Sequence, residues 1–258
     1  MKERAGIQSV EVGFALLQVL AQAPGPLMLR DLAGAAGMSA AKAHRYLVSF
    51  QRLQLVVQDA GSTRYDLGPA ALKLGLASLS RLDAVKLARE RIGAWMEQIG
   101  HTLALAVWGN HGPTIVHWEE SPQAVTVNLR LGDVMPLLSS APGRCFAAYL
   151  SKEAIAPAFK DEIARAQKQG RTDVPVSMPE LRALLEEVRR RGAARVIDLL
   201  LPGIVGFCAP VFDSDGHMVL GIVALGAAGT FDRDWDGAVD LPLRSAAAQL
   251  SDDLGYRG

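Results

Sequence analysis

The stretch that most constrains the fold is Leu27–Arg52, which reads "LMLRDLAGAAGMSAAKAHRYLVSFQR". Its apolar residues repeat at helical spacing on both sides of a short break at residues 37–39. Gly37 is placed to end a first helix, because glycine enters the left-handed backbone region at little cost. Ser39 is placed to cap a second helix, its hydroxyl accepting a backbone N–H. This pattern predicts a helix-turn-helix, whose second helix can enter the DNA major groove. For this stretch alone, an ordinary packed helical hairpin is the alternative.

The segments on either side of the helix-turn-helix favour a DNA-binding domain. Residues 7–21 carry one broad apolar face and predict a preceding helix. Residues 53–68, "LQLVVQDAGSTRYDLG", predict a β-hairpin that turns at Asp59–Thr63. Three helices and a hairpin in this order predict a winged helix-turn-helix domain over residues 1–68. The returning strand places Arg64 where its guanidinium can pair with phosphate.

Composition sets the broad class of the protein. The 258 residues have a net charge of zero, which argues against a strongly basic nucleic-acid coat protein. Residues 1–80, however, hold eight Lys/Arg and five Asp/Glu, a modest positive balance that suits phosphate contact by a small module. No apolar run has the length of a membrane span, and the first residues lack a signal-peptide core. With only Cys145 and Cys208, a disulfide framework is not expected. We expect a cytoplasmic protein without a membrane partner.

The remainder of the chain predicts a linker helix at residues 69–83 and a second domain at residues 84–258. The pattern in this domain indicates α+β architecture, with helices packed on a mostly antiparallel sheet. The expected strands are 102–108, 114–119, 125–130, 194–198, 205–212 and 218–225, the last two joined by a turn at 213–216. The expected helices are 84–99, 143–150, 179–191, opened by a Ser177/Glu180 capping box, and 234–254. Residues 159–176 are polar with little periodicity and are expected to form a mobile excursion.

Enzymatic and metal chemistry find little support in the sequence. The spacing of His101, His111 and His117 matches no metal-binding pattern. Asp213–Gly216 resembles only the start of a calcium loop, and Gly221–Gly226 lacks the Lys-Ser/Thr that follows in a phosphate loop. Cys145 follows a Gly-Arg pair at an expected helix start, where a thiolate would be favoured. Redox sensing is therefore one hypothesis for Cys145, and a buried, unreactive thiol is the alternative. We predict no catalytic residues, no metal and no cofactor.

Several segments in order resemble one family. Residues from Ile7 through "MLRDLAGAAGMSAAKAHRYLVSF" to "YDLGPAALKLG" look like the winged-helix domain of IclR-type transcriptional regulators. The segments "GDVMPLLSSAPGRCFAAYLS", "LRALLEEVRRRG" and "PGIVGFCAPVFDSDGHMVLGIVALG" resemble that family's effector-binding domain. The resemblance implies a GAF-like effector domain and assembly into homodimers or homotetramers. It also implies a small-molecule effector that controls binding to double-stranded operator DNA.

The resemblance points to one face of the second helix as the DNA-reading surface. The candidate DNA-binding residues are Ser39, Ala40, Ala41, Lys42, His44 and Arg45 on this helix and Arg64 on the hairpin. Arg45 matches an Arg of the family and can pair with guanine or phosphate. Ala41 and Lys42 stand where family members commonly carry Ser-Thr. The alternatives are an intra-domain salt bridge for Arg45 and a packing role for His44.

The resemblance also implies where an effector binds. In relatives that take small oxo- or hydroxy-acids, polar side chains grip the carboxylate, and the matching positions here are Val196, Gly206, Val223 and Leu225. None of these side chains donates a hydrogen bond, and burying a carboxylate without partners costs several kcal/mol or more. We therefore expect an apolar or aromatic effector. The other candidate effector-binding residues are Trp108, Trp118, Ser139, Ser140, Gly143, Asp198 and Ile204, with Arg144 as a carboxylate partner. A degenerate pocket is the alternative.

Together these features predict a DNA-binding transcriptional regulator whose operator binding is controlled by a small molecule. The rival hypothesis is a ligand-binding or catalytic sensor domain whose winged helix serves protein contacts.

Overall fold

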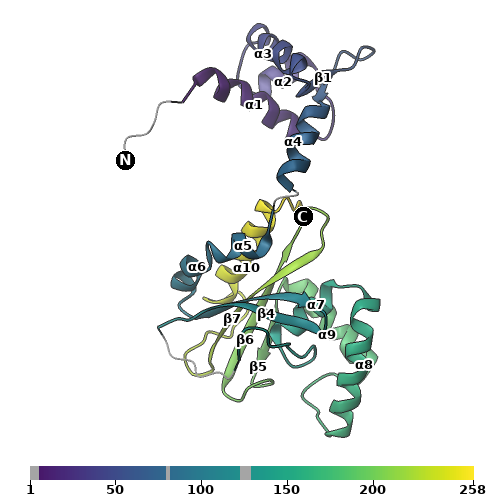
Figure 1. The fold of residues 1–258 in the computed structure, drawn as a ribbon, viewed down its shortest axis with the longest axis vertical. Coiled ribbons are helices and arrows are strands. Elements are labelled where there is room, and N and C mark those ends of the chain that lie inside the picture. The colour runs from purple at the N-terminus through teal and green to yellow at the C-terminus, as the bar shows by residue number, and fades with distance from the viewer. Residues whose placement is uncertain (1–5, 80–81, 123–128) are drawn as a thin grey trace. The chain divides into compact units, whose positions relative to one another are not determined.

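The computed structural model describes residues 6–79, 82–122 and 129–258 of the chain (Figure 1). The chain divides into two compact units, Met1–Arg81 and Leu82–Gly258, each with its own core. Among the described residues, none of the helices combines the length and the apolar character needed to cross a bilayer.

The first unit is a winged helix-turn-helix. Its elements are α1 (Gln8–Gln22), α2 (Leu29–Ala35), α3 (Ala40–Arg52), β1 (Val56–Gln58), β2 (Tyr65–Leu67) and α4 (Pro69–Leu79). Strands β1 and β2 pair in antiparallel fashion, with Val56 opposite Leu67. The core is formed by fully buried side chains from all three leading helices, among them Leu16, Leu32 and Leu47.

The turn between α2 and α3 forms as the sequence predicts. Gly37 has φ +64°, a conformation that suits glycine, and the N–H of Met38 donates to the carbonyl of Ala33 (3.0 Å). The hydroxyl of Ser39 accepts the N–H of Lys42 (3.4 Å), which caps the start of α3. Both ends of the turn are therefore fixed locally.

The second unit is built on a five-stranded antiparallel sheet of order β4-β3-β7-β6-β5, which confirms the predicted α+β class. Its strands are β3 (Thr102–Gly109), β4 (Gly112–Glu119), β5 (Ala194–Ile197), β6 (Ile204–Phe212) and β7 (Met218–Ala227). Its helices are α5 (Ala84–Arg89), α6 (Ile92–Ile99), α7 (Ala141–Tyr149), α8 (Lys152–Lys168), α9 (Met178–Arg191) and α10 (Asp240–Asp253).

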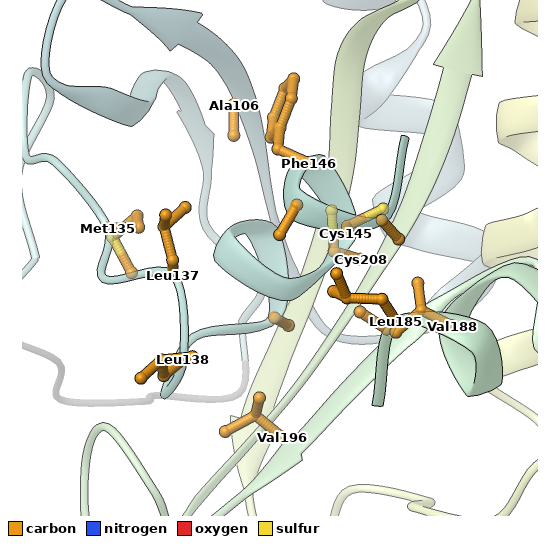
Figure 2. Packing of buried hydrophobic residues seen from close by; sticks show 14 of the residues in the cluster. Ala106, Met135, Leu137, Leu138, Cys145, Phe146, Leu185, Val188, Val196 and Cys208 are labelled. Carbon is orange, nitrogen blue, oxygen red and sulfur yellow. The ribbon is translucent and has the colours of Figure 1, made fainter. Parts of the chain in front are cut away.

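Helices cover both faces of this sheet (Figure 1). Because side chains alternate along a strand, Ala104 and Ala106 of β3 point to one face, and Leu103 and Leu105 point to the other. Helix α7 packs directly on the first face, and α8 and α9 complete the same core. The second face packs against α5, α6 and α10. Figure 2 shows the first core, where Cys145 of α7 lies beside Cys208 of β6 and Phe146 belongs to the same cluster.

Two helical predictions for the second unit are wrong in their extent. Residues 84–99 form two helices, α5 and α6, interrupted at residues 90–91. The last helix begins at Asp240 instead of residue 234, because Asp232 accepts the N–H groups of Asp234 (3.1 Å) and Ala238 (2.6 Å) and holds the preceding segment in turns.

The predicted mobile excursion at 159–176 is also wrong, since residues 152–168 form α8. A narrow apolar stripe, including Ile155, Phe159 and Ala166, is buried against the first core and fixes this otherwise polar helix. The capping box differs as well, because Ser177 makes no side-chain cap and Glu180 accepts the N–H of Val176 (2.9 Å). The predicted strand at 125–130 lies largely outside the described residues, and residues 129–130 are not in a strand.

Candidate functional site

Helix α3 presents one polar face to solvent. Ala43 and Leu47 are fully buried and anchor the opposite face in the core of the first unit. The residues predicted to read DNA from this helix are all exposed: Ser39, Ala40, Ala41, Lys42, His44 and Arg45. The three small side chains at the helix start leave its backbone open to close approach by a partner.

The cationic side chains of α3 are available for contacts outside the protein. Arg45 forms no ion pair with any residue that the structure describes, so the alternative of an internal salt bridge is not supported. His44 is exposed, which does not support a packing role. The face of α3 therefore offers Lys42, His44 and Arg45 to a ligand.

The tip of the β1–β2 hairpin is stiffened by a carboxylate. Asp59 accepts the backbone N–H (2.6 Å) and the hydroxyl (2.7 Å) of Ser62, and these hydrogen bonds lower the pKa of Asp59. The exposed Arg64 donates through Nη1 to the carbonyl of Pro26 (3.1 Å). One of its five N–H donors is thus used within the unit, and the others remain available.

A small apolar cavity of about 50 Å³ lies where the first face of the sheet meets the start of α7. It is lined by strand residues (Ala104, Ile115, Trp118, Val196, Ile204, Gly206, Val223 and Leu225), by Ser140, Ala141 and Pro142 at the α7 start, and by Leu129, Met135, Leu200 and Leu201 from loops. We call this space the effector cavity. It is smaller than the roughly 150 Å³ void that holds benzene in a protein core, so entry of a ring requires part of the wall to move outward.

The structure brings together seven of the eleven residues predicted to surround an effector: Trp118, Ser140, Val196, Ile204, Gly206, Val223 and Leu225. These seven residues belong to four strands and one helix start that are far apart in sequence. The loop residues Leu200 and Leu201 were missed. Their run of leucines just before Pro202–Gly203 is the signal that could have identified them.

The other four predicted residues lie outside the cavity wall. Trp108 packs against Phe146, with ring centroids 6.0 Å apart. Ser139 lines a different cavity, beside α8. A side chain at Gly143 would meet the carbonyl oxygen of Pro136 at 2.0 Å, so this glycine serves close backbone packing.

Asp198 is exposed and organises a loop. It has φ +57°, and its carboxylate accepts the N–H of Gly203 (2.7 Å) while its own N–H donates to the carbonyl of Ile204 (3.0 Å). These hydrogen bonds join the two ends of the loop that carries Leu200 and Leu201, and both leucines line the effector cavity.

The polar groups next to the cavity are already paired within the protein. The hydroxyl of Ser140 donates to the carbonyl of Pro136 (2.6 Å) and accepts the N–H of Gly143 (2.9 Å). The carboxylate of Glu162, on α8, accepts the N–H groups of Leu137 (2.7 Å) and Leu138 (2.9 Å). The wall consequently presents almost purely apolar surface.

Arg144 does not line the effector cavity. Its Nε donates to the carbonyl of Leu138 (2.8 Å) and its Nη1 to that of Arg195 (3.3 Å). Burial lowers the pKa of its guanidinium to about 10, which leaves it charged at neutral pH. Through these two hydrogen bonds the side chain links the loop before α7 to β5.

Thiol chemistry at Cys145 is disfavoured by its surroundings. Cys145 and Cys208 are both fully buried, and burial together with the neighbouring Cys208 raises the pKa of the Cys145 thiol. A protonated, enclosed thiol is a poor nucleophile.

Within the described part of the chain, one group of three potential metal ligands gathers, at Asp213, Asp215 and His217. There Asp213 accepts the backbone N–H groups of the other two residues (3.0 and 2.9 Å), which is the hydrogen bonding of a hairpin turn.

Comparisons with known proteins match both units. Residues 9–60 match the profile of the IclR helix-turn-helix domain, and residues 76–252 match that of the bacterial transcriptional regulator IclR C-terminal domain. The glycerol operon regulatory proteins of Streptomyces coelicolor and Streptomyces griseus are 31% and 33% identical, each over 96% of this chain and 97% of the relative. The crystal structure of Pseudomonas aeruginosa HmgR is similar over 98% of this chain and 100% of that chain, with a TM-score of 0.89 and 35% identity.

Proposed function

The chain belongs to the IclR family of DNA-binding transcriptional regulators, and on that premise we propose that an apolar or aromatic small molecule in the effector cavity controls its operator binding. The family is not enzymatic, which removes the catalytic alternative. The observation that carries the proposal is the apolar cavity wall, in which the hydroxyl of Ser140 is committed to Pro136 and Gly143.

Desolvation supports this effector class. A carboxylate at Val196, Val223 and Leu225 would lose water without gaining a side-chain donor. An aromatic ring loses little on leaving water and gains roughly 25 cal/mol for each Å² of apolar surface that it buries. The ring needs more room than about 50 Å³, and we propose that the loop bearing Leu200 and Leu201 moves outward to admit it.

We further propose that α3 reads the operator in the major groove. Lys42, His44 and Arg45 reach base acceptors or phosphates, with Arg45 forming the bidentate contact that favours guanine. Ser39, Ala40 and Ala41 allow the helix start to approach closely, and the alanine methyl groups can meet thymine methyl groups. Arg64 contacts phosphate from the hairpin.

We also propose that the chain assembles with a second copy of itself, because a homodimer presents two recognition helices to two operator half-sites. Exposed apolar residues at i, i+4 spacing lie on two helices of the first unit: Val10 and Phe14 on α1, and Leu72 and Leu76 on α4. Exposed apolar surface of this kind favours association with a second copy. We propose a homodimer or homotetramer that acts in the cytoplasm, where the chromosome lies.

A thermal-melt screen of the full chain tests the effector class. One panel holds small oxo- and hydroxy-acids, and the other holds aromatic acids and neutral lipophilic aromatics. A ligand that binds the folded state raises the melting temperature, by an amount that grows with its concentration relative to Kd. We expect shifts from the aromatic panel alone. Shifts confined to the small acids would contradict the proposal.

A further inference from the structure

We propose that the second unit holds another ligand site, for a small carboxylate or phosphate anion, at the edge of the sheet beside β5. A cavity of about 270 Å³ lies there between β5, α7 and α9 and is closed on one side by Trp235. It shares no lining residue with the effector cavity. Strand β5 ends the strand order, and its residues Arg195 and Ile197 line this cavity.

The alternation of β5 separates the two cavities. Val196 lines the effector cavity, whereas its neighbours Arg195 and Ile197 line the edge cavity. The guanidinium of Arg195 lies 4.6 Å from the centroid of the Trp235 ring and donates to the carbonyl of Arg233 (2.6 Å). The aromatic ring therefore fixes a cation at the cavity wall.

A second guanidinium lies against the same ring. Arg191, at the end of α9, is 5.0 Å from the Trp235 centroid. Its Nε is buried and has no hydrogen-bond partner among the described residues. A buried donor without an acceptor is costly. Arg191 does not itself line the edge cavity, but its charge lies against the ring that does and adds to the positive potential there.

Arg144 is the second arginine, with Arg195, that lines this cavity. The residue is 9% exposed, and its two hydrogen bonds go to neutral carbonyl groups. No ion pair with a residue that the structure describes is formed by Arg144, Arg191 or Arg195. Burying a guanidinium without a counter-ion in contact is unfavourable, and the local charge is incompletely compensated.

One carboxylate lines the edge cavity and limits this excess. Glu187 lies on α9 and its charge favours the protonated form of Arg144, but the two do not form an ion pair. The positive charge that remains, with several unused N–H donors, matches the oxygens of a carboxylate or phosphate. The cavity volume limits the size of this anion to that of a small molecule.

Isothermal titration calorimetry of the full chain tests this site, with inorganic phosphate and succinate as separate probes in chloride buffer of constant ionic strength. We expect saturable binding of at least one probe. Arg195→Gln should weaken that binding at least about tenfold, and Glu187→Gln should strengthen it, because it removes the opposing charge. Arg190→Gln is the matched control, since this exposed residue on α9 changes the charge equally without lining the cavity.

Absence of saturable heat from both probes, or equal effects of Arg195→Gln and Arg190→Gln, would overturn the proposal. If Arg195→Gln unfolds at too low a temperature to be titrated, Glu187→Gln decides in its place, and an unchanged affinity in that variant would count against the site. Aromatic ligands of the effector cavity should bind Arg195→Gln as tightly as the unaltered protein. The two ligand sites can thus fail independently.

Discussion

At the residue scale, Trp118 and Trp108 allow the proposed ligand contact to be tested against a packing contact. They lie on the paired strands β4 and β3, but Trp118 lines the effector cavity and Trp108 packs on Phe146. Trp118→Leu should weaken binding of an aromatic ligand about tenfold, because an aromatic pair contributes roughly 0.5–1.5 kcal/mol beyond its buried area. Calorimetric titration measures this loss. Trp108→Leu is the control, and an equal loss in both variants would contradict the assignment of the cavity.

In the interface that we propose, Arg45 makes the contact on which recognition of the operator sequence depends most directly. Arg45→Ala should lower operator affinity by about tenfold to one-hundredfold, as expected for loss of a bidentate base contact worth roughly 1–3 kcal/mol. Fluorescence anisotropy with labelled operator measures the change, and the melting temperature should stay the same because Arg45 is exposed and makes no internal ion pair among the described residues. Arg52→Ala, at the other end of α3, is the control. Unchanged operator affinity in Arg45→Ala would remove this residue from the interface.

At the element scale, α8 holds the loop that leads to α7. Glu162→Ala leaves the N–H groups of Leu137 and Leu138 without their carboxylate partner, and hydrogen bonds to a charged group contribute roughly 1.5–3 kcal/mol. We expect a lower melting temperature and faster hydrogen exchange at these two amides. Glu153→Ala alters an exposed acid on the same helix and should change neither quantity. Equal exchange in the two variants would show that Glu162 does not restrain the loop.

Elements with local signals were predictable from sequence, and elements fixed by long-range packing were not. The α2–α3 turn follows from Gly37 and Ser39, whose roles are decided within a few residues. Helix α8 was missed because only a few of its side chains are apolar and buried. Those side chains stabilise the helix by packing against a core built from residues distant in sequence.

The candidate site shows the same division between local and distant causes. The strand positions at Val196, Gly206, Val223 and Leu225 line the cavity as a strand pattern and a family resemblance together suggested. Asp198 was expected near an effector, but its left-handed backbone and its bond to Gly203 give it a loop-closing position. Such backbone geometry leaves no periodic signal in the sequence.

At the scale of the whole molecule, assembly should follow from the apolar residues of α1 and α4. The double variant Leu72→Glu/Leu76→Glu should lower the molar mass in solution, because carboxylates would be buried in the contact that we propose. Analytical ultracentrifugation measures this mass, and operator affinity should fall with it. Lys73→Glu makes the same change in net charge on α4, about a quarter turn from the middle of that face, and is the control. An unchanged mass in the double variant would place the interface elsewhere.

An aromatic ligand in the effector cavity should change operator affinity. The most direct test is an anisotropy titration of an operator selected from random DNA, with and without a saturating aromatic ligand from the melt screen. We predict a change in operator Kd of about 5–150-fold, the range of a coupling free energy of roughly 1–3 kcal/mol. The change should require more ligand in Trp118→Leu than in Trp108→Leu. An operator Kd that stays constant while the ligand saturates the protein would contradict the account.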